Sequence, residues 1–386
     1  MSLDLISRVK PTPAAALAKR ARALAQAGKD VVNFASGDVD HPAPDVATEA
    51  AMRAARRSSV AYTNVDGDPL LKRAIAEDFA RRTGKPLSEE QIIVSTGSKQ
   101  SIYNALYVSA IAGAEVIVPA PYWSSHIDIA VLAGYTPRIV PCGAASGYKL
   151  DGALLERSIT PQTRWLILTN PSSPVGSVYS ASELAELQDV LLRHPQVCVL
   201  CDELYEAFVF DDAQHVSMSV VMPELADRIL TVGGVSKSYA MMGWRIGWAI
   251  GNTEIIARMS TLQSQVTSSP STIGQAAAAA ALTTGEHHRR AVLAHVAHNR
   301  NLALSLLGQV PGLRIAPGEG AIYLFLDISS FGMEDRTFSE RLLDDSGLVV
   351  LPGADCGMSP FLRINIARTH SDLHTGVERL IGFLRK

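Results

Sequence analysis

The feature that most constrains the fold is a series of short, continuously apolar runs separated by segments of helical spacing. The runs cover residues 91–95, 115–119, 165–169, 197–201 and 228–232, and helical patterns at 98–112 and 182–192 lie between them. Strands that are apolar along their whole length and alternate with helices are typical of a parallel sheet covered on both faces. We therefore predict an α/β fold whose ligands bind at the carboxyl ends of these strands.

The pattern changes after about residue 290. A long helix is predicted over 286–307, short strands over 320–326, 348–351 and 361–366, and a final helix over 371–385. These features indicate a smaller α+β domain. A length of 386 residues also favours more than one domain.

The composition excludes several classes of protein. The net charge is -3, and lysines and arginines are scattered, so nothing favours nucleic acid or an anionic membrane as a partner. No apolar stretch has the roughly 20 residues of a membrane span, and the N-terminus lacks the pattern of a signal peptide. We expect a cytoplasmic protein. Cys198 and Cys201 form a C-x-x-C in a predicted strand, where they face opposite sides, and we expect no metal site.

Polar residues follow the predicted strands at the positions where ligands bind. Asp202 comes directly after the run 197–201, with Tyr205 three residues on, and Lys237 follows the run 228–232 in a loop of small residues. Residues 96–100 form a Gly-containing turn into a helix, which suits an anion. Pyridoxal phosphate (PLP) chemistry requires these groups: a lysine for the aldehyde, a carboxylate for the ring nitrogen, and N–H groups and cations for the phosphate. Each residue alone is more often a surface or capping residue, so the prediction depends on their combination.

In this order and spacing the residues resemble the class I and II aminotransferases, which are fold-type I PLP-dependent enzymes of the aspartate aminotransferase superfamily. The resemblance covers nearly the whole chain. Residues 30–40 are similar to the family segment D-V-I-x-L-x-x-G-E-P-D, residues 61–71 to its Tyr…Gly…Leu signature, and residues 121–123 to its P-x-Y/W segment. The resemblance implies a large PLP-binding domain over 46–288 with a mostly parallel sheet. It also implies a small α+β domain made of 1–45 and 289–386.

The resemblance also implies a role for each matching residue. Lys237 holds PLP as a Schiff base and acts as the catalytic base, Asp202 pairs with the ring nitrogen, and Tyr205 bonds the phenolic oxygen. The ring stacks on Trp123. The phosphate is held by Gly97, Ser98, Lys99, Ser236 and Arg245. Gly37 and Arg363 bind the substrate carboxylate. Tyr62 reaches the cofactor of a neighbouring subunit, which implies a homodimer with shared active sites.

Two positions depart from the family pattern. Ser173 stands where the family has the asparagine that bonds the phenolic oxygen, and the shorter serine reaches it only through water. Gly234 stands where the family has a phosphate-binding serine, and Ser236, next to Lys237, is the expected substitute. His41 follows the Pro-Asp position, where it either reads the substrate side chain or lies in a surface loop.

We therefore expect a PLP-dependent aminotransferase that moves an amino group between an amino acid and a 2-oxo acid. Another PLP reaction on the same fold, such as that of a β-lyase, a cyclase or an oxidative enzyme, stays open at this point because fold does not fix function. A non-catalytic PLP-fold module is a further alternative. No arginine or lysine lies in 263–271, so the sequence does not support aspartate as the best substrate.

Overall fold

The larger of the two parts of the molecule is built on a seven-stranded sheet. The computed structural model describes residues 4–57, 60–316 and 318–385. The strand order is β2-β8-β7-β6-β5-β3-β4. The bounds are β2 (Ile92–Ser95), β3 (Glu115–Ala120), β4 (Thr136–Pro141), β5 (Thr163–Thr169), β6 (Cys198–Asp202), β7 (Ile229–Gly234) and β8 (Gly247–Ile250). Only β8 runs antiparallel to its neighbours within this sheet. The prediction of a mostly parallel sheet is confirmed.

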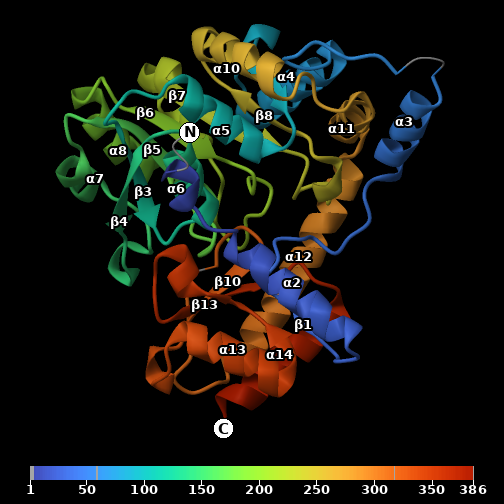
Figure 1. Cartoon of the computed structure of the whole chain (residues 1–386), viewed down its shortest axis with the longest axis vertical. Coiled ribbons are helices and arrows are strands. Elements are labelled where there is room, and N and C mark those ends of the chain that lie inside the picture. The colour runs from blue at the N-terminus through green and yellow to red at the C-terminus, as the bar shows by residue number, and fades with distance from the viewer. Residues whose placement is uncertain (1–3, 58–59, 317, 386) are drawn as a thin grey trace.

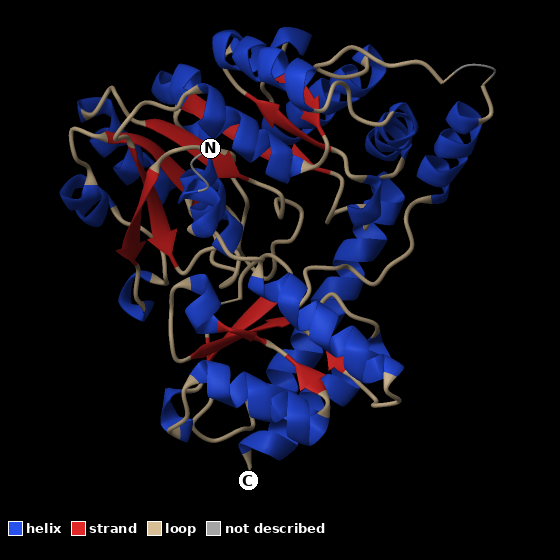
Figure 2. Cartoon of the chain, viewed as in Figure 1, coloured by secondary structure: helices blue, strands red, loops and turns tan. Residues whose placement is uncertain are grey.

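Helices cover both faces of this sheet (Figure 2). Alternate strand residues enter different cores: Leu200 packs with α5 (Ser98–Val108) and α10 (Thr253–Val266), whereas Val199 packs with α7 (Gly152–Ser158) and α8 (Ala181–Arg193). This is why the central strands are apolar along their whole length. The other helices of this part are α3 (Asp45–Ala55), α4 (Pro69–Thr83), α6 (Ser124–Leu132), α9 (Met218–Val221) and α11 (Thr272–Thr284).

The C-terminal part is built on a second sheet of order β12-β13-β10-β9, with antiparallel pairing throughout. Its strands are β9 (Arg314–Ile315), β10 (Tyr323–Asp327), β12 (Leu351–Pro352) and β13 (Phe361–Asn365), and its helices are α13 (Asp335–Ser346) and α14 (His370–Leu384). The prediction of a single strand over 348–351 is wrong. The strand is interrupted at Val350. β11 (Leu348–Val349) therefore pairs with β1 (Val32–Asn33), whereas β12 joins the four-stranded sheet.

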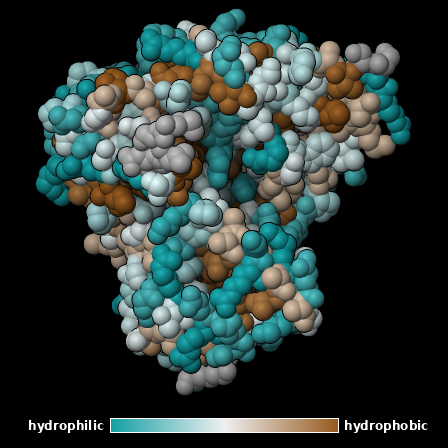
Figure 3. All heavy atoms as spheres, viewed as in Figure 1, coloured by the Kyte–Doolittle hydropathy of each residue, from teal (hydrophilic) through white to brown (hydrophobic). Residues whose placement is uncertain are grey.

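The helix α12 (Glu286–Leu307) joins the two parts, with the bounds that the sequence predicts, and Figure 1 shows it running from the upper part of the molecule into the lower part. The N-terminal α2 (Pro13–Gln26) packs on the C-terminal part through Ala21 and Leu343. The predicted boundary between 288 and 289 falls inside α12, and the division into domains stays a prediction. Figure 3 shows the surface hollowed between the upper and lower parts.

Short elements complete the description. They are α1 (Asp4–Ser7) and the 3-10 turns Glu89–Gln91, Ala144–Ser146, Pro223–Arg228, Met242–Trp244, Ser329–Phe331 and Gly353–Cys356. In the described part of the chain, each helix is too short or too polar to span a bilayer.

Candidate active site

The carboxyl ends of β5, β6 and β7 open into a cavity of about 300 Å³ that β10 and β13 line from the other side. A volume of this size is typical of a small-molecule site. The cavity brings together eleven of the thirteen predicted site residues, namely Gly37, Ser98, Lys99, Trp123, Ser173, Asp202, Tyr205, Ser236, Lys237, Arg245 and Arg363. Gly97 and Tyr62 are the two that do not line it.

Lys237 follows β7 and points across the cavity to the N-terminal segment. Its Nζ donates a hydrogen bond of 2.5 Å to the carbonyl oxygen of Gly37. A Cβ at position 37 would lie 2.8 Å from the hydroxyl oxygen of Tyr323 and 3.4 Å from the Lys237 amine. A side chain here would displace the Tyr323 hydroxyl, so glycine lets the backbone of this segment approach the lysine closely.

Asp202 ends β6, and its carboxylate faces a histidine that sequence analysis missed. Oδ1 accepts a hydrogen bond of 3.2 Å from the backbone N–H of Leu204, and Oδ2 lies 3.3 Å from Nε2 of His126. His126 is fully buried and meets the Trp123 ring edge-on, with centroids 5.2 Å apart. The sequence could have indicated His126, because it lies three residues after Trp123, in the first turn of α6. His126 and Asp202 form one hydrogen-bonded pair behind the Trp123 ring.

A second missed residue, Tyr323 on β10, connects Tyr205 with Arg363. The Tyr205 and Tyr323 hydroxyl oxygens are 3.0 Å apart, and the guanidinium carbon of Arg363 lies 4.2 Å above the Tyr323 ring. Burial raises the pKa of Tyr205, and the neighbouring Tyr323 raises it further, so Tyr205 stays a neutral hydrogen-bond donor. Arg363 is buried and donates to the Ala35 carbonyl at 2.7 Å, while its Nε has no partner within the described residues. The guanidinium therefore retains an N–H for a ligand.

Cations and free N–H groups gather where α5 begins. Arg245 lies against Gly97, where a Cβ would overlap its guanidinium, and Gly97 has φ +81, in the left-handed region that favours glycine. Ser98 and Lys99 are the first residues of α5, whose first-turn N–H groups have no partner inside the helix. The Lys99 ammonium lies 4.7 Å from the Trp123 ring centre; burial and the nearby Arg245 lower its pKa. The arrangement suits an anion.

The structure explains the departure at Gly234. A Cβ there would come within 3.2 Å of the Ile246 carbonyl oxygen and of the Leu204 side chain. A serine hydroxyl has little room at this position, and the residue does not line the cavity, whereas Ser236 does. That Ser236 binds the phosphate in place of the family's serine at position 234 stays a prediction.

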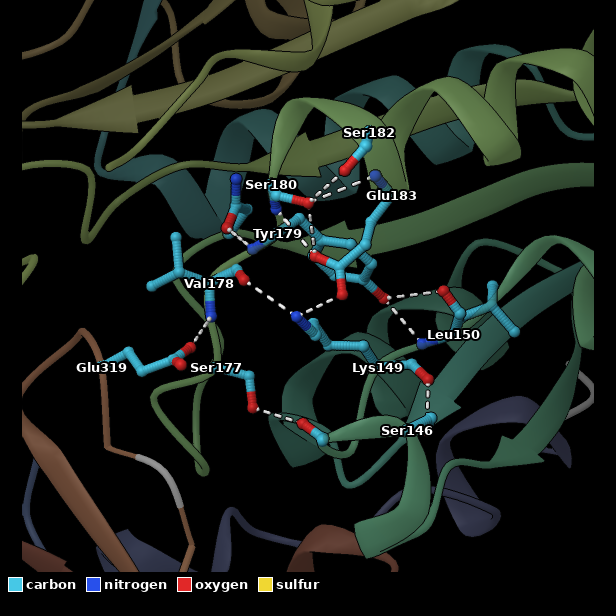
Figure 4. A network of polar contacts seen from close by, with 12 residues as sticks. Ser146, Lys149, Leu150, Ser177, Val178, Tyr179, Ser180, Ser182, Glu183 and Glu319 are labelled. Atoms are coloured by element: carbon cyan, nitrogen blue, oxygen red, sulfur yellow. Dashed lines mark hydrogen bonds and ion pairs between the residues drawn. The ribbon is translucent and has the colours of Figure 1, made fainter. Parts of the chain in front are cut away.

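Ser173 lies between the main cavity and a neighbouring one of about 30 Å³, and it lines both. The smaller space has room for one or two waters. The loop that carries Ser173 is held by the network in Figure 4. There Ser177 donates to the Gly147 carbonyl at 2.7 Å, the Val178 N–H donates to Glu319 at 3.3 Å, and Lys149 donates to the Val178 carbonyl at 3.2 Å.

The same network is anchored on α8. Lys149 pairs with Glu183 at 2.5 Å, and Glu183 forms a capping box with Ser180 at the start of that helix. The Tyr179 hydroxyl accepts from the Leu150 N–H at 2.7 Å. Because these contacts fix the loop without using the Ser173 hydroxyl, that hydroxyl is available to a ligand or a water.

Tyr62 and His41 lie away from the cavity. Tyr62 is 88% exposed and borders a separate surface hollow with Thr63 and Thr272. Within one chain it does not reach the site, as expected if it acts on a neighbouring subunit. The His41 ring contacts His288 at 4.9 Å between centroids, so it packs on α12 and does not line the cavity.

Comparisons with known proteins agree with this geometry. Residues 29–380 match the family described as aminotransferase class I and II. The chain belongs to this aminotransferase family. An aspartate/prephenate aminotransferase of Cereibacter sphaeroides is 42% identical over 98% of each chain. An aspartate aminotransferase of Rhizobium meliloti is 39% identical over 94% of this chain and 90% of its own length.

Solved structures show the fold of the aminotransferase. The aspartate aminotransferase from Rhizobium meliloti superposes with a TM-score of 0.95 at 38% identity, covering 100% of this chain and 99% of its own. The aspartate aminotransferase from Thermus thermophilus with maleate superposes with a TM-score of 0.92 at 32% identity, covering 98% of each. The predicted fold type I is confirmed, and so is the prediction of an enzyme that transfers amino groups. The lyase, cyclase and non-catalytic alternatives are not favoured.

Proposed function

We propose that this aminotransferase holds PLP on Lys237 and exchanges amino groups between aspartate and a 2-oxo acid. The observation that carries the proposal is the convergence of Lys237, Asp202, Tyr205, Arg245 and Arg363 on one cavity. These side chains offer the donor set that PLP needs: an amine, a carboxylate, a phenol and two guanidinium groups. When bound, the cofactor ring takes up the electron pair that the substrate Cα releases with its proton.

The residues around the ring act in distinct ways in this proposal. Asp202 keeps the ring nitrogen protonated, and His126 at 3.3 Å holds the Asp202 carboxylate in place. Trp123 stacks on the ring. Tyr205 donates to the phenolic oxygen, and Ser173 reaches the same oxygen through a water in the adjoining cavity. Lys237 removes the proton from the substrate Cα.

The anionic groups of cofactor and substrate are divided between the two ends of the cavity. Gly97, Ser98, Ser236 and Arg245 bind the phosphate, because helix N-termini and guanidinium groups suit dianions. At the other end Arg363 grips the substrate α-carboxylate, with the N–H of Gly37 beside it. A guanidinium fork fixes the orientation of a carboxylate as well as its charge. That orientation turns the Cα–H toward the Lys237 amine.

Lys99 supports a substrate with a second carboxylate. It lines the cavity and takes part in no ion pair among the described residues. With Arg245 on the phosphate and Arg363 on the α-carboxylate, Lys99 is available to the side-chain carboxylate of aspartate as well as to the phosphate. The names of the relatives from Cereibacter sphaeroides and Rhizobium meliloti support aspartate as the donor. Under this proposal the second cation comes from the start of α5 and not from 263–271.

A homodimer is part of the proposal. Tyr62 is exposed and separate from its own chain's cavity, and the family resemblance assigns it to the cofactor phosphate of a neighbouring subunit. In a dimer Tyr62→Phe weakens cofactor retention without changing the oligomeric state. Placement in the cytoplasm stays a prediction from the sequence.

The visible absorption spectrum of protein reconstituted with PLP tests the proposal. Aspartate is expected to bleach the cofactor band, and 2-oxoglutarate to restore it. Lys237→Ala serves as the control that lacks the band. Lys99→Gln is expected to lower kcat/KM for aspartate at least about 10-fold, and to lower kcat/KM for alanine much less, because alanine has no side-chain carboxylate. Ammonia release without an oxo acid, or wild type that acquires no band, would contradict the proposal.

A further inference from the structure

A small charged cavity lies behind the loop that carries Lys237. Its volume is about 20 Å³, room for a single water, and its lining includes Asp78, Arg82, Glu203, Glu206 and Arg289. None of these five residues lines the active-site cavity. Thr231 also lines the small cavity, and its hydroxyl has no partner within the described residues, which indicates a buried water there.

Glu203 connects this rear cavity with the active site, because it directly follows Asp202. Its side chain is 4% exposed. Oε1 accepts hydrogen bonds from the Ser217 hydroxyl at 2.9 Å and the Met218 N–H at 3.2 Å, and a weak one from the Cys201 thiol at 3.4 Å. Among the described residues, every hydrogen-bond donor to this carboxyl therefore binds Oε1, and none binds Oε2.

The other oxygen faces an unpartnered nitrogen. Oε2 of Glu203 lies 3.8 Å from Nε2 of His215. That Nε2 is buried and has no hydrogen-bond partner within the described residues. His215 also makes a hydrogen bond with the backbone of Asn170, which leaves Nδ1 as the donor and Nε2 as an acceptor. A buried acceptor without a donor costs free energy.

The protonation states of the two groups are complementary. Burial raises the pKa of Glu203 to about 7, although Ser217 and Arg82 oppose the shift. Burial, together with Arg82, lowers the pKa of His215 to about 4. Between about pH 4 and pH 7 the imidazole is therefore uncharged, and the carboxyl retains a proton that Oε2 can offer to Nε2. At 3.8 Å the two atoms lie beyond hydrogen-bond distance, so sharing the proton requires His215 and Glu203 to approach each other by several tenths of an ångström.

Other charged groups nearby are occupied elsewhere. From α4, Arg82 binds Asp78 through Nε at 2.8 Å. From α12, Arg289 pairs with Glu286 at 2.9 Å and approaches Glu206 at 3.8 Å. On β6, burial holds the Cys201 thiol neutral by raising its pKa. No guanidinium forms an ion pair with Glu203 among the described residues, so an ionised Glu203 would face the lone pair of His215.

We propose that Glu203 and His215 share one proton and act as positioning residues that fix the Asp202–Tyr205 turn against the Ser173 loop. The turn is held because Glu203 leads directly from Asp202. The loop is held because His215 and Val216 bind Asn170, whose side-chain amide donates to the Val216 carbonyl at 3.3 Å, three residues before Ser173. The effect on catalysis depends on the function proposed above, whereas the shared proton does not.

Glu203→Gln tests the proton without changing the shape of the side chain. The glutamine amide donates permanently to His215, as the protonated glutamate does. A buried carboxyl with a raised pKa makes wild type lose stability as pH rises from its unfolded value near 4.5 toward 7, while glutamine is indifferent to pH. In cofactor-free protein, the melting temperature of Glu203→Gln relative to wild type is expected to rise by about 4 °C between pH 5 and pH 8.

His215→Phe, made both in wild type and in the Glu203→Gln variant, tests the sharing itself. At pH 6 it is expected to lower the melting temperature by about 2 °C in both backgrounds, because each loses a hydrogen bond. At about pH 8.5 the decrease is expected to be larger in the Glu203→Gln background, where the bond to His215 still exists, than in wild type, where only the bond to Asn170 is lost. Equal effects of His215→Phe in both backgrounds at both pH values would overturn the shared proton.

A last measurement tests the positioning role. In reconstituted enzyme, kcat/KM of wild type relative to Glu203→Gln is expected to fall about 3-fold or more between pH 6 and pH 8.5. The pH midpoint of the cofactor band is expected to differ between the two proteins. If the melting curves behave as expected and these ratios stay flat, the pair is structural only and the positioning role is wrong. A protein that binds no PLP would contradict the proposed function and leave the melting test intact.

Discussion

The turn after β6 sends neighbouring residues to two different environments. Asp202 and Tyr205 face the active-site cavity, whereas Glu203 and Glu206 face the small cavity behind it. Both the active-site cavity, at the front, and the small cavity, at the rear, are rich in charged side chains, but these side chains differ in whether the chain itself supplies their partners. At the front, Arg363 retains an unpartnered Nε and Lys99 has no ion pair within the described residues. At the rear, Arg82 binds Asp78 at 2.8 Å, and Arg289 binds Glu286 at 2.9 Å and approaches Glu206 at 3.8 Å.

Whether a buried charge has a partner within the chain distinguishes residues that bind a ligand from residues that stabilise the fold. Buried charges that are paired by the chain stabilise the fold only if the pairing stays complete, since a lone buried charge is costly. Buried or half-buried charges without internal partners carry that cost until a ligand supplies the counter-charge. Front substitutions should therefore change activity more than stability, and rear substitutions the reverse.

The largest effect is expected from Lys237→Ala at the front. We expect kcat to fall at least about 10³-fold, because the base that moves the substrate proton is removed. The free energy of unfolding should change little, since Lys237 makes a single hydrogen bond to Gly37. Steady-state kinetics and urea unfolding of the same preparation measure both. A large loss of stability together with activity would break the comparison between front and rear.

Arg82→Ala is the opposite experiment at the rear. Its side chain is 21% exposed and bonds Asp78, whose carboxyl is 7% exposed. Asp78 then keeps its ion pair with Arg81, and Glu206 keeps Arg289 at 3.8 Å. Because the loss of charge is only partly compensated, we expect the free energy of unfolding to fall by about 2 kcal/mol. Urea denaturation of the cofactor-free protein measures this loss. Arg53→Ala, on an exposed pair of α3 with Glu49, is the matched control and should change stability by less than about 0.5 kcal/mol.

The sequence allowed the front to be predicted and not the rear. Lys237, Asp202 and Arg245 stand out because they follow apolar runs and match a family pattern in order. His126 and Tyr323 were missed, since one lies inside a helix and the other inside a strand, where a polar residue reads as ordinary packing. The rear charges come from α4, the turn after β6 and α12, which are far apart in sequence and meet only through the tertiary fold.

The fold shows the same limit. Long periodic segments such as α12 are predicted with the bounds that the structure has. The two-residue strands β11 and β12 are merged in the prediction, because nothing local separates Leu348–Val349 from Leu351–Pro352. Their separation comes from different partners, β1 for one and β13 for the other. Pairing partners of very short strands are decided by tertiary contacts.

Tyr323→Phe sharpens the comparison, because the Tyr205–Tyr323 pair is an internal hydrogen bond on the front side. We expect a loss of about 1 kcal/mol in stability, as the buried Tyr205 hydroxyl loses its 3.0 Å partner. Activity should fall only about 3-fold to 10-fold, because the ring that packs under Arg363 remains. Thermal unfolding and kinetics with aspartate measure the two effects. Tyr103→Phe, on the stacked Tyr103–Tyr107 pair of α5, is the control.

The smallest effect is expected at a histidine cluster on α12 that belongs to neither cavity. His288 and His295 both contact the His41 ring, at 4.9 and 6.0 Å between centroids. Burial lowers the pKa of both, and the nearby histidines lower it further, so the folded state binds fewer protons than the unfolded state below pH 6.5. Stability is therefore lost as pH falls through that range. His295→Gln should reduce the loss between pH 7 and pH 5 by less than about 1 kcal/mol, because the half-exposed rings are screened by solvent. Urea midpoints at the two pH values measure it, and an unchanged difference would show that the cluster tolerates its charge.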